Sequence, residues 1–216
     1  MSRTKKRKSK IGTIIYNHII NNKREYLTIT ILFFVGVIIS IILFNNSNEV
    51  TLIEISTYLN NLFNNIKNNE NMDLFQILKE TLINKLTITL LLWFGASTII
   101  GIPVVYGTIL FKGFSIGYTI NSLLFVYGSW KGLLISISFL LLHNIIFVPT
   151  MFAISVSGVK LYKSIMKNKQ RENIKLEILR HTIFCFIMLL GMLISAFIET
   201  YLSTNIAIIL LKNIKF

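Results

Sequence analysis

The sequence predicts an all-α fold, a polytopic membrane helical bundle with about five transmembrane helices. Two observations lead to this prediction. Hydrophobic residues make up 53% of the 216-residue chain, charged residues only 14%, and the mean hydropathy is +0.66. Residues 86–111 form a stretch of 26 residues without a formal charge. Because a helix of about 20 apolar residues spans the hydrocarbon core of a bilayer, this stretch is long enough to cross it.

Five apolar runs define the expected transmembrane helices, and in chain order they are 26–44, 86–111, 114–127, 133–159 and 181–198. The first is longer than the apolar core of a signal peptide, so we expect it to remain as a helix. The third would reach only about 21 Å as a helix, which is short of a bilayer core of about 30 Å. It is therefore either one half of a helical hairpin with the fourth run or one arm of a re-entrant loop, and the hairpin is favoured.

Lysine and arginine residues are unevenly distributed between the connecting segments. Sixteen of the 22 fall in residues 1–25, at Lys112 and in residues 160–180, which alternate along the chain with the segments that hold the other six. Cytoplasmic loops are enriched in these residues. We therefore expect the tail 1–25 and the loop 160–180 in the cytoplasm, and the loop 45–85 and the tail 199–216 outside, in a multi-pass protein of the cell membrane.

This topology accounts for the net charge of +13, because lysines beside an anionic leaflet fix the orientation of a membrane protein. The first ten residues hold no aromatic side chain that a nucleic-acid-binding segment would place among its basic residues. We expect contact with the lipid bilayer and none with nucleic acid. The sequence has no metal-ligand spacing, catalytic triad or phosphate loop, so no catalytic residue, metal or cofactor is predicted and an enzyme is not expected.

The loop 45–85 contains the main candidate for a partner-binding surface. Its apolar residues recur at helical spacing, while asparagines line the opposite face. Two interpretations stay open: a helical hairpin lying on the outer membrane surface, and a docking face for an extracytoplasmic protein. The candidate partner-binding residues are Leu59, Leu62, Phe63 and Ile66, together with Trp130 and Glu199 at the outer ends of the helices.

Small residues and prolines gather in the second to fourth runs. In lipid, helices associate through close packing of small residues, and an internal proline kinks a helix. We expect packing or kinks at Gly95, Gly101, Pro103, Gly107, Gly113, Gly117 and Pro149.

The polar pair His143 and Asn144 is expected at mid-membrane depth, where unsatisfied polar groups are costly. It forms either structural hydrogen bonds or a functional contact. Glu199 closes the last run, where it would meet water or pair with Lys131 or Lys85.

Several short motifs carry a family resemblance through their order and spacing. They are Leu92-Trp93-Phe94-Gly95, Gly101-Ile102-Pro103, Phe111-Lys112-Gly113-Phe114-Ser115-Ile116-Gly117, Gly128-Ser129-Trp130-Lys131-Gly132, Leu142-His143-Asn144-Ile145-Ile146-Phe147-Val148-Pro149 and Ala196-Phe197-Ile198-Glu199. With them the chain resembles the bacterial stage II sporulation protein M family over nearly its whole length after the basic tail. Leu142 and Asn205 stand where that family often has a proline, which leaves the local helix breaks open.

The resemblance implies a function in endospore formation. Such a protein would be a membrane scaffold in the mother-cell membrane at the sporulation septum. It would anchor a peptidoglycan-degrading complex with stage II sporulation proteins D and P during septum migration and engulfment. The alternative from the sequence is a small transporter or channel with a polar site between the fourth and fifth helices. The oligomeric state stays open, a homo-oligomer included.

Overall fold

The computed structural model describes residues 17–68, 73–98, 101–167 and 171–213. Within these ranges the regular structure is helical throughout and contains no strand, which confirms the all-α prediction. The helices are α2 (Lys23–Asn45), α3 (Glu49–Asn68), α4 (Leu74–Ser97), α5 (Gly101–Tyr127), α6 (Ser129–Ser136), α7 (Leu142–Lys167), α8 (Arg171–Phe197) and α9 (Thr204–Asn213), with π-helical segments η1 (Ile137–Leu141) and η2 (Ile198–Ser203).

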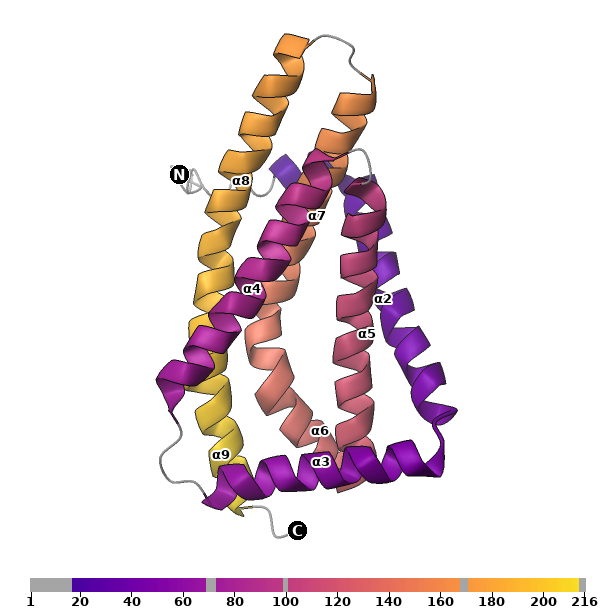
Figure 1. The fold of residues 1–216 in the computed structure, drawn as a ribbon, viewed down its shortest axis with the longest axis vertical. Helices are drawn as coiled ribbons and strands as arrows, with labels where there is room; N and C mark the ends of the chain where they lie inside the picture. The colour runs from indigo at the N-terminus through magenta and orange to yellow at the C-terminus, as the bar shows by residue number, and fades with distance from the viewer. Residues whose placement is uncertain (1–16, 69–72, 99–100, 168–170, 214–216) are drawn as a thin grey trace, which may run out of the picture.

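Helices α2, α4 and α5, the continuous segment α6–η1–α7 and the continuous segment α8–η2–α9 run along the length of the molecule, and α3 lies across one end of them (Figure 1). We call this the α3 end. The opposite end, where α7 ends and α8 begins, carries Lys160, Lys163, Lys175 and Arg180, and we call it the basic end. Four helical segments of the described chain are long and apolar enough to cross a membrane: 23–45, 101–127, 129–166 and 174–210. The remaining one, α4, carries Lys79, Glu80 and Lys85 in its first half.

The chain breaks between α4 and α5, where the sequence predicted a continuous helix. The predicted helices 86–111 and 114–127 are therefore wrong in their bounds: α4 ends at Ser97, and residues 101–127 form one helix. Thr98 is extended and donates its backbone N–H to Gly95 O. A Cβ at Gly101 would collide with Gly95 O, so the two helices meet at a point that a larger residue could not occupy.

This break changes the interpretation of two residues. Pro103 lies in the first turn of α5 and does not kink a longer helix, since a helix tolerates proline in its first turn, where the backbone N–H has no intrahelical partner. Lys112 lies in the interior of α5 and is not a loop residue. Pro149, by contrast, lies inside α7 at the expected position.

Helices α2 and α5 approach each other closely through glycines. A Cβ at Gly113 would collide with Phe33 O of α2, and one at Gly117 would collide with the side chain of Ser40. Close approach of this kind replaces hydrophobic association in lipid. Gly107 is different, because no atom lies within 4 Å of its would-be Cβ, so it packs against no other helix of the described chain.

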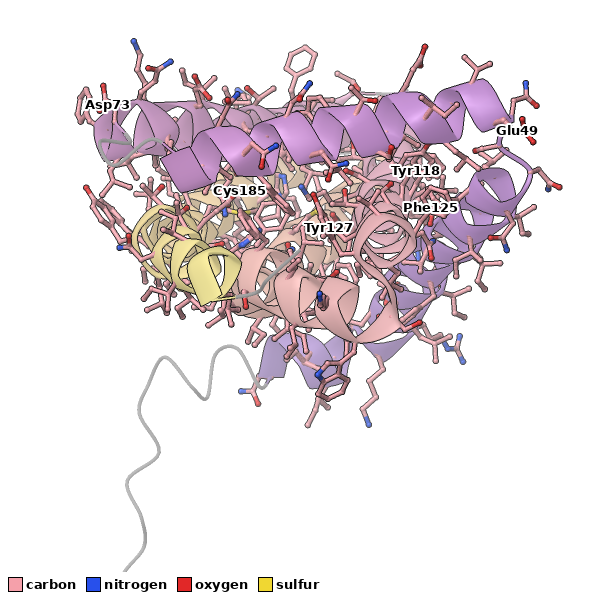
Figure 2. All side chains as sticks on the ribbon, turned by 90° about the horizontal axis from the view of Figure 1, so that it is seen from below. Glu49, Asp73, Tyr118, Phe125, Tyr127 and Cys185 are labelled. Atoms are coloured by element: carbon pink, nitrogen blue, oxygen red, sulfur yellow. The ribbon has the colours of Figure 1, made fainter. Side chains whose placement is uncertain are left out.

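The apolar face of α3 is turned toward the bundle. Phe63 stacks on Tyr127 at 5.1 Å and on Phe139 at 5.8 Å between ring centroids, and Ile66 is buried in the same cluster. The Tyr127 hydroxyl donates to Asn60 Oδ1 at 3.2 Å. Figure 2 shows α3 stretched across the base of the bundle between Glu49 and Asp73. Asp73 caps α4 by accepting from the backbone N–H groups of the next turn.

Candidate functional site

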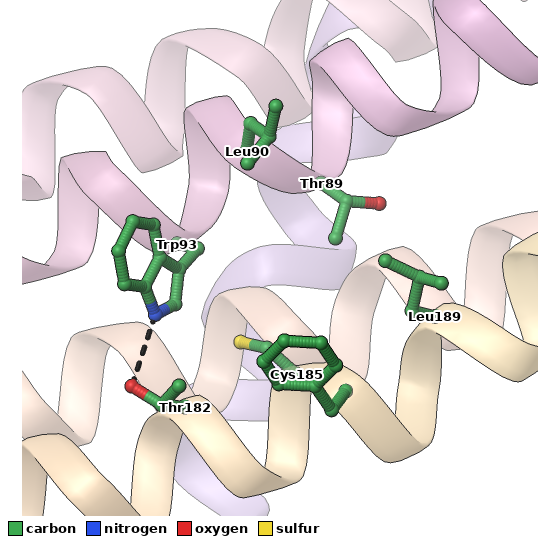
Figure 3. Close-up of a pocket in the computed structure, with 7 residues that line it drawn as sticks. Thr89, Leu90, Trp93, Thr182, Cys185 and Leu189 are labelled. Atoms are coloured by element: carbon green, nitrogen blue, oxygen red, sulfur yellow. Dashed lines mark hydrogen bonds between the residues drawn. The ribbon is translucent and has the colours of Figure 1, made fainter.

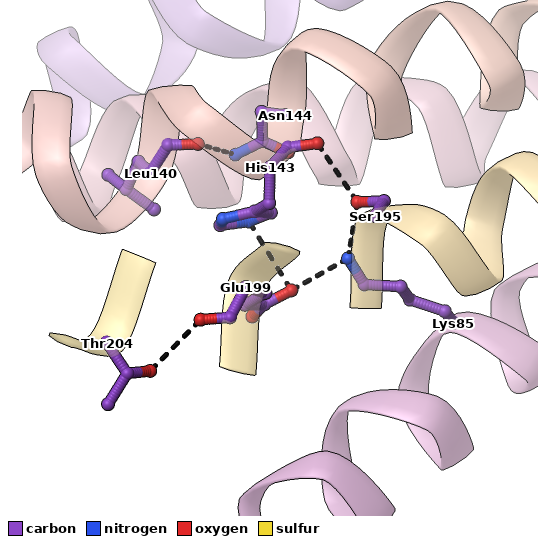
Figure 4. Close-up of polar contacts among 7 residues, drawn as sticks. All are labelled: Lys85, Leu140, His143, Asn144, Ser195, Glu199 and Thr204. Atoms are coloured by element: carbon purple, nitrogen blue, oxygen red, sulfur yellow. Dashed lines mark hydrogen bonds and ion pairs between the residues drawn. The ribbon is translucent and has the colours of Figure 1, made fainter. Parts of the chain in front are cut away.

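A polar cluster occupies the middle of the bundle, where five helical segments meet. We define it as Lys85 of α4, Lys112 of α5, His143 and Asn144 of α7, Ser195 of α8 and Glu199 of η2. Figure 4 shows most of its contacts. Residues separated by up to 114 positions in the chain are thereby brought together, so the cluster is a product of the tertiary fold.

The strongest contact is an ion pair. Lys85 Nζ lies 2.7 Å from Glu199 Oε2, which confirms one of the pairings expected for Glu199. The same amine donates to Ser195 Oγ at 2.7 Å, and Ser195 in turn donates to the backbone oxygen of His143 at 2.9 Å. His143 Nε2 lies 3.6 Å from Glu199 Oε2. One carboxylate thus links three helices at a depth where an unpaired charge would be costly.

The two lysines of the cluster flank one aromatic ring. Lys85 Nζ and Lys112 Nζ each lie 4.9 Å from the ring centroid of Phe147, which is fully buried. An ammonium over an aromatic face is attracted by the ring quadrupole. Lys112 has no carboxylate within ion-pair distance among the described residues, so the cluster holds two amines and a single carboxylate.

Both π-helical segments border the cluster. Glu199 is the second residue of η2, and His143 follows η1 by two positions. A π-turn inserts one extra residue into a helix and often marks a functional site. The chain continues as helix through Leu142 and Asn205, so neither position where the family often has a proline breaks its helix here.

Four buried polar atoms in or just after these segments lack a hydrogen-bond partner among the described residues. They are His143 Nδ1, Asn144 Oδ1, Thr200 Oγ1 and Ser203 Oγ. Asn144 donates through its amide nitrogen to Leu140 O at 2.7 Å, while its oxygen has no partner among the described residues. Buried polar groups are nearly always hydrogen-bonded, so unpaired atoms in the same region indicate room for a ligand or water.

A cavity of about 400 Å³ opens between α3 and the bundle and reaches the cluster. We call it the α3 cavity. Its inner end is lined by Lys112, His143, Asn144 and Glu199, and its walls by apolar residues that include Leu59, Leu62 and Phe139. A second cavity of about 400 Å³, the α4–α5 cavity, lies between α4 and α5 and also reaches Lys112 and Ser115.

A smaller cavity of about 190 Å³ between α4 and α8 is apolar. Trp93, Thr182 and Cys185 are among its lining residues, and Trp93 Nε1 donates to Thr182 Oγ1 at 3.1 Å (Figure 3). Cys185 is a free, buried thiol. With its polar groups paired to each other, this cavity offers packing space and little to recognise a polar ligand. The described residues also contain no group of three His, Cys, Asp or Glu side chains that could hold a metal.

The predicted partner-binding residues divide into two groups. Trp130 is 71% exposed on α6 at the α3 end. Phe63 and Ile66 are buried against the bundle, and Leu59 and Leu62 are partly buried beside them, so these four side chains do not form a free surface in this structure and their binding of a partner stays a prediction. Glu199 belongs to the polar cluster and is not a residue of the outer rim.

Sequence reasoning missed Lys112 and Ser195, two members of the polar cluster, and Phe147, the ring that its lysines flank. Lys112 directly follows the predicted helix 86–111, so the sequence places it in a connecting segment, whereas it lies inside α5. Ser195 and Phe147 lie in apolar runs and carry no signal of their own. The unusual feature that could have indicated the site is that two lysines and one glutamate occur next to or within apolar helices, where charges are rare.

A family model described as stage II sporulation protein M matches residues 29–204. Comparisons with curated proteins and with solved structures give no match. The family match runs from α2 to the start of α9 and so covers the bundle, α3 and the polar cluster. The chain therefore belongs to the stage II sporulation protein M family and is a sporulation-related, multi-pass membrane protein.

Proposed function

We propose that this protein is a scaffold in the mother-cell membrane at the sporulation septum. It holds a peptidoglycan-degrading complex, with stage II sporulation proteins D and P as partners, while the septal membrane migrates around the forespore. The observation that carries the proposal is the placement of α3. The apolar face of α3 packs against the bundle through Phe63 and Ile66, so the opposite face of α3 points outward from a rigid support.

The distribution of charge supports an orientation with α3 toward the cell wall. The basic tail 1–25 and the segment 160–180 hold fifteen lysines and arginines, and Lys160, Lys163, Lys175 and Arg180 of the second segment lie at the basic end, opposite α3. Lysines and arginines are enriched on the cytoplasmic side of membrane proteins. Lys112 no longer contributes to this count because it lies inside α5.

The outward face of α3 replaces the inward one as the proposed contact surface. It comprises a stripe of exposed residues at helical spacing, Ile53, Thr57, Asn61 and Asn64. Trp130, exposed at the same end, extends it. An exposed isoleucine and tryptophan within a polar surround are typical of an interface that binds a folded protein.

The test is co-purification of each partner from sporulating cells with the variant Ile53→Glu. Loss of a partner, with the scaffold still in the membrane, is the expected result. Leu176→Glu makes the same change at the basic end and should leave the partners bound. If both variants retain both partners equally, the outward face of α3 is not the contact surface.

The scaffold itself is proposed to break no bond. Purified protein without partners should release no peptidoglycan fragments from cell walls. Fragment release by the purified chain would contradict this assignment and would make it an enzyme.

A small transporter is the second candidate, because the polar cluster lines a cavity at membrane depth. Against a path through the bundle stands a core of fully buried apolar residues between the cluster and the basic end, with Leu92, Ile109 and Met151 among them. A substrate flux in reconstituted vesicles that His143→Leu abolishes would favour transport. The scaffold proposal predicts that no such flux exists.

A further inference from the structure

We propose that the α3 cavity binds the headgroup of one anionic phospholipid, with its phosphate at Lys112. The first argument is charge. Lys85 already has a carboxylate at 2.7 Å, whereas Lys112 lies over the Phe147 ring and has no carboxylate within ion-pair distance among the described residues. The cluster therefore holds one more amine than carboxylate, and a monoanionic phosphate diester would supply the missing negative charge.

The second argument is the unused hydrogen-bonding capacity at the inner end of the cavity. His143 and Asn144 are both more than nine-tenths buried, and both line the cavity. His143 Nδ1 can donate to a phosphate oxygen when it carries the proton, and Asn144 Oδ1 can accept from a hydroxyl. A phosphate that bears a polyol therefore matches both atoms, whereas a choline headgroup supplies no donor to Asn144.

The third argument is the shape and lining of the two cavities. Ser115 and Lys112 line both of them, so these two residues lie between the α3 cavity and the α4–α5 cavity. The α4–α5 cavity is bordered by Ile88, Leu91 and Phe111, and Phe111 is 68% exposed on the outside of the bundle. The headgroup would occupy the polar α3 cavity, and an acyl chain would lie along the apolar border between α4 and α5.

A cavity of about 400 Å³ also limits the choice of occupant. An α-helix with its side chains is about 10 Å wide, so a partner's transmembrane helix does not fit beneath α3. A second copy of the chain would bring the same unpaired lysine and no free carboxylate from its own cluster. A small anionic headgroup fits the cavity in size and supplies the negative charge that a second copy lacks.

The test is native mass spectrometry of the purified protein with phosphatidylglycerol and phosphatidylcholine of the same acyl chains. We expect one retained phosphatidylglycerol and at least tenfold weaker retention of phosphatidylcholine. Lys112→Gln should weaken phosphatidylglycerol retention roughly tenfold or more, the loss expected for one charge-assisted pair. Lys175→Gln, the same change at an exposed position of the basic end, should have no effect.

A second cavity variant and a competition with inorganic phosphate complete the test. Ser115→Leu narrows both cavities without changing a charge, and it should also weaken retention, which covers the case in which Lys112→Gln fails to fold. Inorganic phosphate at millimolar concentration should not displace the lipid. Equal retention of both lipids, retention unaffected by both cavity variants, or displacement by inorganic phosphate would each overturn the proposal.

Discussion

Replacing Glu199 by glutamine should destabilise the bundle because it leaves the Lys85 ammonium buried without a counter-ion. The two charged atoms are 2.7 Å apart, and the side chains are 7% exposed for lysine and 33% for glutamate. Coulomb attraction at that distance is about 6 kcal/mol at an effective dielectric constant of about 20, and desolvation offsets much of it. Breaking a buried pair from one side costs about 3–5 kcal/mol. The partial exposure of Glu199 favours the lower end, about 3 kcal/mol.

The assay is the free energy of unfolding by SDS titration in mixed micelles, carried out as a double-mutant cycle. Glu199→Gln should lower it by about 3 kcal/mol, and adding Lys85→Met should restore most of the loss, because the buried ammonium that lost its counter-ion is then absent. Lys163 and Glu25 form a matched pair at 2.8 Å whose lysine side chain is 58% exposed. Glu25→Gln should cost less than about 1 kcal/mol. Additive effects of the Lys85 and Glu199 changes would refute the reasoning.

Two further predictions concern packing and pH. Gly113→Leu should lower the free energy of unfolding by about 2–3 kcal/mol because the new side chain meets the backbone of α2. Gly107→Leu should be neutral or slightly stabilising because there is open space around that position. Equal effects of the two changes in the same SDS titration would contradict the close contact at Gly113. His18 has a pKa lowered from 6.5, first by burial and then by Lys160, so the unfolded state binds its proton more readily and stability should fall as the pH drops below about 6.5. His18→Gln should flatten this dependence in unfolding measured between pH 7.5 and 5; an unchanged slope would contradict the role of His18.

Helix identity could be predicted from the sequence, but helix ends could not. Long uncharged runs specify spans because a bilayer core requires them, and the amphipathic pattern of residues 52–66 specifies α3. The break between Ser97 and Gly101 brings Gly95 and Gly101 into a close contact that the pattern of apolar residues does not encode. An uncharged run therefore resembled a single helix although it contains the end of one and the start of another.

The candidate site was partly predictable for a related reason. His143, Asn144 and Glu199 stood out as polar residues in apolar surroundings, and the pairing of Glu199 with Lys85 was among the expected alternatives. Lys112 was misassigned together with the helix boundary. The face of α3 that docks onto the bundle could not be distinguished from a partner-binding face, because an apolar stripe has the same sequence signature whatever covers it.

The most direct test of the scaffold account is the side of the membrane on which α3 lies. Asn64→Cys on α3 and Met166→Cys at the basic end place an exposed thiol at each end, and the native Cys185 is buried. Intact cells are treated with a membrane-impermeant maleimide before and after permeabilisation. The account predicts that Cys at position 64 is labelled in intact cells and that Cys at position 166 is labelled only after permeabilisation. The reverse pattern would place α3 in the cytoplasm and contradict a wall-facing scaffold.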